Sequence, residues 1–412
     1  MRPFLNETKE RMKILYLSDV YFPRVNGVST SIRTFVAQLQ QMGHEVHLLA
    51  PDYQAEGATP ATDEYWINRI PARRIFFDPE DRLMRYGEAL TQLQALRRED
   101  YDLVHIHTPF VAHYLGLRLA RLLDVPCVAT YHTFFEDYLH HYLPWIPRPF
   151  ARGLARQISR RQCNAVHGII APSQPLLDVL RRYRVATPAE VVATGLPAAR
   201  FEPDDGAAFR ARHGIAAQRP VMLYLGRVAF EKNIDFLLRM TLVLRRKLPD
   251  VLLLIAGEGP AQSSLRQMSI ELSLQDNVRF IGYLNRDTDL NACYRAADLF
   301  VFSSLSETQG LVLLEAMAQA VPVVAIAELG TRSILVEGEG ASIAPCDEHI
   351  FADKAYELLH DADLRQRLGA AGRRYVSTHW TAKAQAERML GFYRQVLAVG
   401  ETAQVAEGVV VS

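Results

Sequence analysis

Short, almost wholly apolar runs alternate with helix-length segments along most of this chain. Residues 13–18 form the first apolar run, and residues 29–42 follow it with apolar side chains at helical spacing. Residues 45–50 begin the next apolar run. Runs that are apolar on both faces are typical of strands in parallel sheets covered by helices. The alternation therefore predicts βαβ units, which wind right-handed and bind ligands at the carboxyl ends of their strands.

The same alternation occurs twice, with a break marked by Gly195, Pro197 and Pro203. A chain of 412 residues is also too long for one ordinary core. Both observations predict an α/β protein of two Rossmann-like, doubly wound domains that face each other across a ligand-binding cleft. The predicted strands are residues 103–107, 126–131, 168–173 and 191–193 in the first series, and 221–225, 251–256, 278–282, 299–302 and 321–326 in the second.

The predicted domain limits follow from these two series. The first Rossmann-like domain covers residues 12–195, and the second covers residues 196–378. Residues 1–11 are an N-terminal extension, residues 379–399 a C-terminal helix that can return to the first domain, and residues 400–412 a flexible tail. Further helices are expected at residues 111–122, 233–248, 350–368 and 382–397.

Charge and cysteine content narrow the class of protein. Lys and Arg together number 46, as do Asp and Glu, so the chain has no basic excess that would indicate a nucleic-acid partner. Its four cysteines form no CxxC pair, which indicates small buried side chains in a reducing cytosol. No apolar run reaches about 18 residues, and the N-terminus lacks an apolar signal core. We therefore expect a cytoplasmic protein, with peripheral attachment to the inner face of the cell membrane as a further option.

The clearest group of candidate site residues runs from Glu307 to Glu315, after a predicted strand and a polar turn. Gly310 lets the backbone approach a ligand closely, and the amides of Gly310, Leu311 and Val312 lie in a first helical turn, where free N–H groups attract phosphate. A carboxylate suits sugar hydroxyls because it accepts two hydrogen bonds. The spacing indicates a site for a phosphorylated sugar, although an acid near a helix start and a solvated helix residue would also fit it.

Two cations follow the first strand of the second series. Arg227 and Lys232 lie between that strand and a predicted helix. They can clamp a diphosphate leaving group, on which negative charge grows in the transition state. The alternative interpretation is a surface ion pair with Glu231.

Two strand ends in the first series carry further candidates. Gly27 belongs to an Asn-Gly-Val turn that resembles a phosphate-approach loop, but the missing GxGxxG pattern weakens a dinucleotide-binding interpretation. His132 lies at the carboxyl end of a predicted strand with acids close by. His105, His107 and His113 alternate between strand and helix and indicate no convergent site, so we expect no metal and no cofactor.

A basic and aromatic stretch follows His132. Arg152, Arg156 and Arg160 recur every four residues and share one face of a predicted helix, which Trp145 and Arg148 precede. Basic residues beside interfacial aromatic residues suit docking on an anionic lipid surface. A solvated basic face is the alternative.

These motifs together resemble glycosyltransferase family 4, which has the GT-B fold, over nearly the whole chain. The most specific match is the E-x7-E motif from Glu307 to Glu315. The R-x4-K pair of Arg227 and Lys232 and the Asn-Gly-Val turn at Gly27 agree in order and place. The sequence departs from the family at Thr194-Gly195-Leu196-Pro197, where a branched residue and Asp usually follow the glycine, and at Ala320, which replaces a frequent glycine.

The resemblance implies a retaining transfer of a sugar from a nucleotide diphosphate donor without a metal. It implies that Glu307 contacts the donor sugar and Glu315 the ribose, while Arg227 and Lys232 hold the diphosphate. It further implies that Gly27 approaches the same phosphates from the first domain, the acceptor domain. His132 would lie beside the donor sugar near the acceptor.

Two details narrow the resemblance to bacterial diacylglycerol glucosyltransferases. They are the run from His132 to Tyr138 and Gln309, where mannosyltransferases of the family more often carry Phe. We therefore expect transfer of glucose from UDP-glucose to a membrane lipid such as diacylglycerol. The alternatives are a GDP-mannose-dependent α-mannosyltransferase acting on a lipid or polysaccharide, a non-catalytic sugar-nucleotide sensor or membrane adaptor, and, more remotely, a nicotinamide-dependent oxidoreductase.

Overall fold

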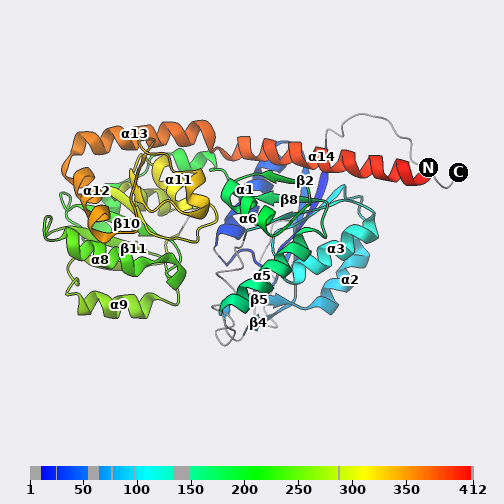
Figure 1. Cartoon of the computed structure of the whole chain (residues 1–412), viewed down its shortest axis with the longest axis horizontal. Coiled ribbons are helices and arrows are strands. Elements are labelled where there is room, and N and C mark those ends of the chain that lie inside the picture. The colour runs from blue at the N-terminus through cyan, green and yellow to red at the C-terminus, as the bar shows by residue number, and fades with distance from the viewer. Residues whose placement is uncertain are drawn as a thin grey trace. The chain divides into compact units, whose positions relative to one another are not determined.

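The computed structural model describes residues 11–24, 26–53, 65–75, 78–96, 98–132, 148–285 and 288–409. These residues divide into two compact units. Unit 1 takes the described residues up to Thr194 and those from Gln385 onward, and unit 2 runs from Gly195 to Ala384. Each unit contains one parallel sheet flanked by helices (Figure 1). Two doubly wound α/β units are what the alternating sequence pattern predicts.

Unit 1 contains a seven-stranded parallel sheet in the order β3-β2-β1-β6-β7-β8-β9. A separate antiparallel pair, β4 and β5, lies outside this sheet. The strands are β1 Lys13–Leu17, β2 Glu45–Pro51, β3 Ile67–Ile70, β4 Ala72–Ile75, β5 Asp78–Met84, β6 Leu103–Ile106, β7 Cys127–Thr130, β8 Gly168–Ala171 and β9 Ala189–Val191. The helices are α1 Gly27–Gln41, α2 Tyr86–Leu96, α3 Val111–Leu123, α5 Arg148–Cys163 and α6 Gln174–Arg182.

Helices cover both faces of the unit 1 sheet, so its strands are buried on both sides. Leu15 and Leu17 of β1 pack into a core cluster with α2, α3, α5 and α6, whereas Ile14 and Tyr16 pack into a second cluster with α1. This division follows from the alternating direction of side chains along a strand. Helix α14, Ala382–Val409, contributes Met389 and other apolar residues to the second cluster, so it closes one face of unit 1 (Figure 1).

Unit 2 contains a six-stranded parallel sheet in the order β12-β11-β10-β13-β14-β15. The strands are β10 Val221–Leu225, β11 Leu252–Ala256, β12 Val278–Gly282, β13 Leu299–Phe302, β14 Val323–Ala325 and β15 Ala341–Ile343. The helices are α7 Gly206–Arg212, α8 Ile234–Leu244, α9 Gln262–Glu271, α10 Leu290–Arg295, α11 Leu311–Ala318, α12 Glu348–His360 and α13 Ala362–His379, with short 3-10 turns η1 Ala198–Phe201, η2 Phe230–Lys232 and η3 Leu329–Ser333.

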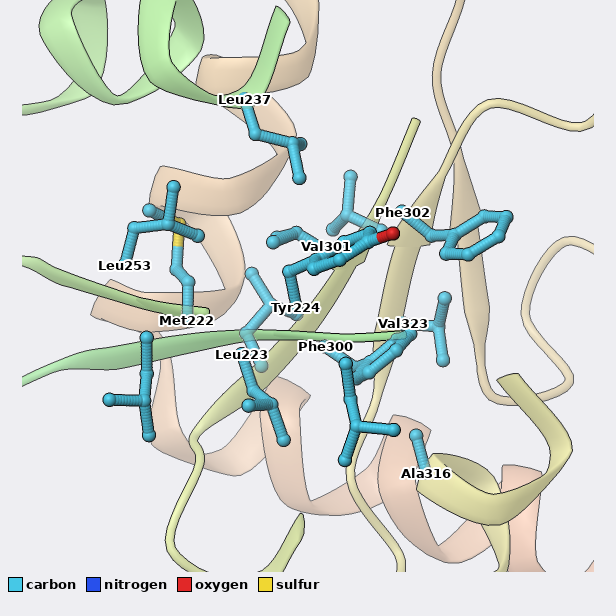
Figure 2. Close-up of a cluster of buried hydrophobic side chains, with 14 of the residues drawn as sticks. Met222, Leu223, Tyr224, Leu237, Leu253, Phe300, Val301, Phe302, Ala316 and Val323 are labelled. Atoms are coloured by element: carbon cyan, nitrogen blue, oxygen red, sulfur yellow. The ribbon is translucent and has the colours of Figure 1, made fainter. Parts of the chain in front are cut away.

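The core of unit 2 surrounds the adjacent strands β10 and β13. Tyr224 of β10 and Phe302 of β13, both labelled among the buried side chains of Figure 2, stack with ring centroids 6.4 Å apart. Both side chains are buried, and the Tyr224 hydroxyl donates to the carbonyl of Arg227 just beyond the strand end. The core therefore reaches directly beneath the loops at the carboxyl ends of these two strands.

Three helix boundaries differ from the sequence-based expectation. The predicted helix at residues 350–368 is two helices, because Asp361 takes an extended conformation and its carboxylate accepts from the amide of Leu364 to begin α13. Helix α8 ends at Leu244, four residues before the expected end. Helix α14 continues through Val409, past Gly400, because a glycine within a helix costs only about 1 kcal/mol and no proline follows it.

Candidate functional site

The carboxyl ends of β10 and β13 bring two charged loops together in unit 2. Lys232 closes the loop after β10, and Glu307 lies in the loop after β13. Their side chains form an ion pair with Nζ and Oε2 2.7 Å apart, and each side chain is 20% exposed. Because β10 and β13 are adjacent in the sheet, the two loops emerge at the same edge.

Hydrogen bonds between the two loops hold this pair in place. The amide of Asn233 donates from Nδ2 to the carbonyl of Ser303, and the Ser303 hydroxyl donates back to the carbonyl of Asn233 at 2.8 Å. Asn233 adopts a left-handed conformation with φ 55°, which ends η2 and allows α8 to begin. Sequence analysis did not single out Asn233 or Ser303, because a reciprocal bond over a sequence separation of 70 residues has no local signature.

The electrostatics show that four charged residues share this edge. Burial works to lower the pKa of Lys232, but the charge and hydrogen bond of Glu307 and the charge of Glu231 outweigh it, so the pKa is raised. Arg227 acts in the opposite direction on Lys232, as a like charge does at short range. The arrangement thus concentrates two cations and two acids, and Lys232 stays protonated.

Helix α11 begins at the same edge. Gly310 is its N-cap with φ 89°, a left-handed conformation that side chains rarely adopt, and Leu311 and Val312 form the first turn. The backbone of Gly330 packs directly against that of Thr308, because a Cβ added at Gly330 would lie 1.9 Å from the Thr308 carbonyl oxygen. The first-turn amides of a helix have no intrahelical acceptor, so this helix start offers donors to an anion beside Glu307.

Glu315 lies deeper in unit 2 than the sequence suggests. It is 2% exposed, and its Oε2 accepts a hydrogen bond of 2.9 Å from the Tyr294 hydroxyl. It is therefore not a solvated helix residue. Its contact with a ribose stays a prediction.

A glycine-rich turn after β11 supports the loop that carries Arg227. An added Cβ at Gly257 would lie 2.0 Å from the Gly226 carbonyl oxygen, and one at Gly259 would lie 2.4 Å from that of Val228. Only glycine permits such close backbone contact at both positions. The sequence signal for this contact is the Gly-Glu-Gly-Pro segment that directly follows a buried strand.

In unit 1, the Asn-Gly-Val turn begins α1. The Asn26 side chain is the N-cap and accepts from the amide of Ser29 at 2.8 Å, while Gly27 is the exposed first residue of the helix. An added Cβ at Gly27 would meet no atom within 4 Å. Packing inside the described part of the protein therefore does not require glycine at this position.

His132 follows β7 and adjoins a row of buried rings. Its Nε2 lies 3.2 Å from Nδ1 of His107, which follows the adjacent strand β6, and the ring of His105 lies 4.1 Å from that of His107. Burial lowers the pKa of His132 to about 4 and holds those of His105 and His107 well below the usual range. His105 and His107 lie two residues apart along β6 and its end, so their rings share one face, and His132 reaches His107 from the end of the adjacent strand β7.

Asp19 is a further buried acid at the carboxyl ends of the unit 1 strands. Its carboxylate accepts from the Thr108 hydroxyl at 2.8 Å and from the amides of Phe110 and Ala112 at 3.2 and 3.0 Å. Burial raises its pKa to about 6, although these hydrogen bonds work to lower it. It thus ties the end of β1 to the start of α3. No sequence motif pointed to this contact.

Helix α5 carries the predicted basic face. Arg152, Arg156 and Arg160 are exposed, as are the apolar side chains of Phe150 and Leu154. Ala155, Ser159 and Cys163 form its buried face. Trp145 lies outside the described residues, and Arg148 is the first residue of the helix.

Across the residues that the structure describes, no group of three or more His, Cys, Asp or Glu side chains is arranged to hold a metal ion. No helix among them is both long and apolar enough to cross a membrane.

Two family descriptions match this chain, one in each unit. Glycosyltransferase Family 4 matches residues 25–200, and Glycosyl transferases group 1 matches residues 205–375. The alpha-monoglucosyldiacylglycerol synthase of Streptococcus pneumoniae is 33% identical over 320 residues, which are 76% of this chain and 71% of that protein. The GDP-mannose-dependent alpha-mannosyltransferase of Mycobacterium tuberculosis is 28% identical over 93% of this chain and 97% of its own length.

Solved structures share the fold at lower identity. Sucrose-phosphate synthase from Thermosynechococcus elongatus superposes with a TM-score of 0.76 at 22% identity, covering 94% of this chain and all of that one (100%). Anabaena HepE in complex with UDP-glucose gives a TM-score of 0.69 at 18% identity and covers 92% and 99%. With these matches and the paired parallel sheets, this chain belongs to glycosyltransferase family 4 and has the GT-B fold.

Proposed function

We propose that this glycosyltransferase transfers glucose from UDP-glucose to diacylglycerol with retention of configuration, and so forms an α-glucosyl lipid. The observation that carries the proposal is the cluster of Lys232, Glu307 and Arg227 at the strand ends beside the start of α11. Cations, a helix start and a carboxylate within one small region suit a molecule that joins a diphosphate to a sugar.

The reaction follows from the charges of these groups. Departure of the nucleoside diphosphate places negative charge on its terminal oxygens, and the two cations stabilise that charge as it grows. Glu307 accepts hydrogen bonds from the sugar hydroxyls, and its hydrogen bond with Lys232 orients both side chains before the donor arrives. The amides of Gly310, Leu311 and Val312 hold the phosphates. We assign to Glu315 the contact with the ribose of the donor. The step requires no metal, and we assign no general base.

Unit 1 supplies the remaining donor contacts in this proposal. Gly27 is exposed and has space around its Cα, as a backbone that admits a phosphate requires. His132 is partly exposed and neutral at pH 7, so it offers the sugar a hydrogen bond without a charge. Closure of the two units on the donor, which excludes water from the reaction, is part of the prediction.

A lipid acceptor is supported by the relatives and by α5. Two relatives are alpha-monoglucosyldiacylglycerol synthases, from S. pneumoniae at 33% identity and Acholeplasma laidlawii at 26% identity. Exposed arginines beside the exposed Phe150 and Leu154 suit a helix that lies on an anionic bilayer at the inner face of the membrane. The docking face comprises Arg148, Arg152, Arg156 and Arg160 with Trp145.

Vesicle sedimentation tests the docking face. Arg152→Glu, Arg156→Glu and Arg160→Glu combined should release the protein from vesicles that contain anionic lipid, because each basic residue near such a surface contributes about 1 kcal/mol. The matched control is Arg98→Glu, Arg118→Glu and Arg121→Glu, three exposed arginines of unit 1 outside α5. Equal release by both triple variants, or by neither, would remove α5 from the proposal.

A GDP-mannose-dependent mannosyltransferase is the second candidate. It is favoured by the 28% identity with the mycobacterial mannosyltransferase, which extends over 93% of this chain. Gln309 is the residue that favours glucose, and it is buried beside the Gly310 helix start. A sugar-nucleotide sensor or membrane adaptor is the non-catalytic candidate.

A donor screen decides among these functions. The protein is incubated separately with UDP-glucose and GDP-mannose and with diacylglycerol in mixed anionic vesicles, and the lipid product is analysed by mass spectrometry and by NMR of its anomeric proton. We expect a hexosyl lipid of α configuration from UDP-glucose alone. Product from GDP-mannose alone would support the second candidate, and neither product nor donor hydrolysis would support the sensor.

A further inference from the structure

His107 lies behind His132, and its geometry gives it a defined relation to that residue. The two ring planes are inclined by only 21°, with centroids 5.5 Å apart and Nδ1 of His107 3.2 Å from Nε2 of His132. When two imidazole nitrogens are 3.2 Å apart, a centroid separation of 5.5 Å is close to the largest that the two rings can have. The two nitrogens therefore point directly at each other, with the rings edge to edge. The contact is a hydrogen bond in the plane of both rings rather than a face-to-face stack.

The ring of His107 is held firmly. Tyr16 packs on it with centroids 4.5 Å apart, and His105 packs on it at 4.1 Å. His105 is itself fixed, because its Nδ1 is hydrogen-bonded to the Tyr393 hydroxyl at 2.6 Å and its Nε2 to the Thr130 hydroxyl at 2.7 Å. His107 therefore presents Nδ1 to His132 in one orientation.

The surroundings of Nε2, the second ring nitrogen of His107, indicate which of its two nitrogens carries the proton. Nε2 is buried and has no hydrogen-bond partner among the described residues, and His107 lines a pocket of about 30 Å³ together with His113 and Gln162. A buried N–H without an acceptor is the rarer of the two unsatisfied states, so the lone pair belongs on Nε2 and the proton on Nδ1. His107 then donates from Nδ1 to Nε2 of His132.

We propose that His107 is a positioning residue that holds His132 in the Nδ1–H tautomer, so that His132 presents a hydrogen-bond donor to the ligand. The tautomer of a histidine is set by the hydrogen bond that its other nitrogen makes, and Nε2 of His132 is occupied as an acceptor. Nδ1 is the remaining nitrogen, and its N–H suits a sugar hydroxyl oxygen. The catalytic consequence rests on the proposed function, but the tautomer does not.

Nitrogen NMR of the full chain labelled with ¹⁵N-histidine tests the tautomer without donor or acceptor. His107→Phe and His132→Phe assign the signals. At pH 7.5 we expect His132 to be protonated on Nδ1 in the unaltered protein and to shift to the Nε2–H form, which a free imidazole prefers, in His107→Phe. His113→Phe is the matched control, because His113 borders the same pocket without a hydrogen bond to His132. A proton on Nε2 in the unaltered protein, or an unchanged tautomer in His107→Phe, overturns the proposal.

Glycolipid synthesis tests the consequence. His107→Phe should lower kcat/KM about tenfold or more, and His107→Asn should retain more activity, because its amide can still donate to His132. If His107 had a purely structural role, His107→Phe would keep a higher kcat/KM than His107→Asn, since Phe preserves the ring packing and Asn does not. Tautomer change without loss of kcat/KM overturns the positioning role. Failure of the unaltered protein to make any glycolipid instead rejects the proposed function and leaves the NMR result standing.

Discussion

Lys232 and Glu307 form an ion pair in which each side chain is only 20% exposed. Each charge therefore provides the other with a partner in place of the water that burial has removed. Breaking such a pair by removing one partner leaves an uncompensated charge. Arg227 adds a second positive charge close enough to affect the pKa of Lys232. Because Glu307 and Glu231 balance the two cations of this edge, loss of Arg227 would leave it with a net negative charge that repels a diphosphate.

Removing Arg227 should therefore impair chemistry more than folding. We expect Arg227→Ala to reduce kcat/KM for transfer by about 100-fold or more, since one lost contact to a charge that develops in the transition state has that magnitude. Steady-state kinetics with the donor identified by the screen provides the measurement. Arg246→Ala, an exposed arginine of unit 2, is the control and should leave kcat/KM unchanged. Near-normal turnover of Arg227→Ala would refute its role.

Gly27 provides a test of ligand approach that separates binding from folding. Gly27→Ala should stabilise the protein slightly, by about 0.5–1 kcal/mol, because the position is helical and an added Cβ meets no atom within 4 Å. The same methyl group should weaken donor affinity if a phosphate approaches this backbone. Calorimetric titration with UDP-glucose and with UDP measures the affinity.

Gly87→Ala is the matched control for Gly27→Ala. Gly87 is also exposed in the first turn of a unit 1 helix, α2, and an added Cβ there meets no atom within 4 Å. We expect similar stabilisation and unchanged donor affinity in this variant. If both variants bind the donor as the unaltered protein does, Gly27 does not contact the phosphates.

Helix α3 starts without a side-chain cap from its own segment. Its N-cap residue is Phe110, and the carboxylate of Asp19, from the turn after β1, accepts from the amides of Phe110 and Ala112 instead. An acid at a helix N-terminus satisfies free N–H groups and complements the helix dipole. One buried residue thus joins the end of a central strand to the start of a helix that packs beside it.

Asp19→Ala should lower the free energy of unfolding of unit 1 by about 1–2 kcal/mol, as loss of a helix cap does. Urea unfolding at pH 7.5, followed by circular dichroism, gives the value. Asp178→Ala in α6 is the control, because Asp178 accepts only an exposed hydrogen bond from the side chain of Gln174. A smaller loss in Asp19→Ala than in the control would show that the cap contributes nothing.

The two units should respond differently to acid. In the described part of unit 1, burial lowers the pKa of six histidines, to about 4 in His113 and His132, well below the usual range in His105 and His107, and below the usual value in His44 and His47. In unit 2, burial also lowers the pKa of His213, which is partly exposed. Below about pH 6.5 the unfolded chain binds protons that these buried rings do not, so the free energy of unfolding falls as the pH falls towards 4.

Asp19 opposes this trend, because its pKa is raised to about 6 and its folded form gains a proton over the lower part of the same range. Six histidines outweigh one carboxyl group, so unit 1 should lose more stability than unit 2 between pH 7.5 and pH 5.5. The protein is unfolded in urea at both pH values, and each sample is then pulse-labelled by hydrogen exchange at one fixed pH. Mass spectrometry of its peptides gives a separate urea midpoint for each unit. We expect the urea midpoint of unit 1 peptides to fall further, and His113→Phe to reduce that fall. Equal shifts would contradict the expectation.

Local chemistry made the strand-and-helix alternation predictable. Apolar runs, helical spacing and turn glycines act over a few residues, so the sequence alone determined two doubly wound units and the motifs at their strand ends. Gly43, a turn glycine just after α1, takes φ 87°. The E-x7-E and R-x4-K motifs were readable because each lies within one loop and the helix that follows it.

Only the tertiary structure decided which of these strand ends meet. The Lys232–Glu307 pair spans 75 residues, the His107–His132 contact 25 and the Asp19–Ala112 contact 93. Sheet order and register determine these contacts, and neither is written in a local pattern. The same reason applies to α14, whose apolar residues gain their partners only when the chain returns to unit 1. Local periodicity thus selected the elements, whereas long-range packing selected the neighbours.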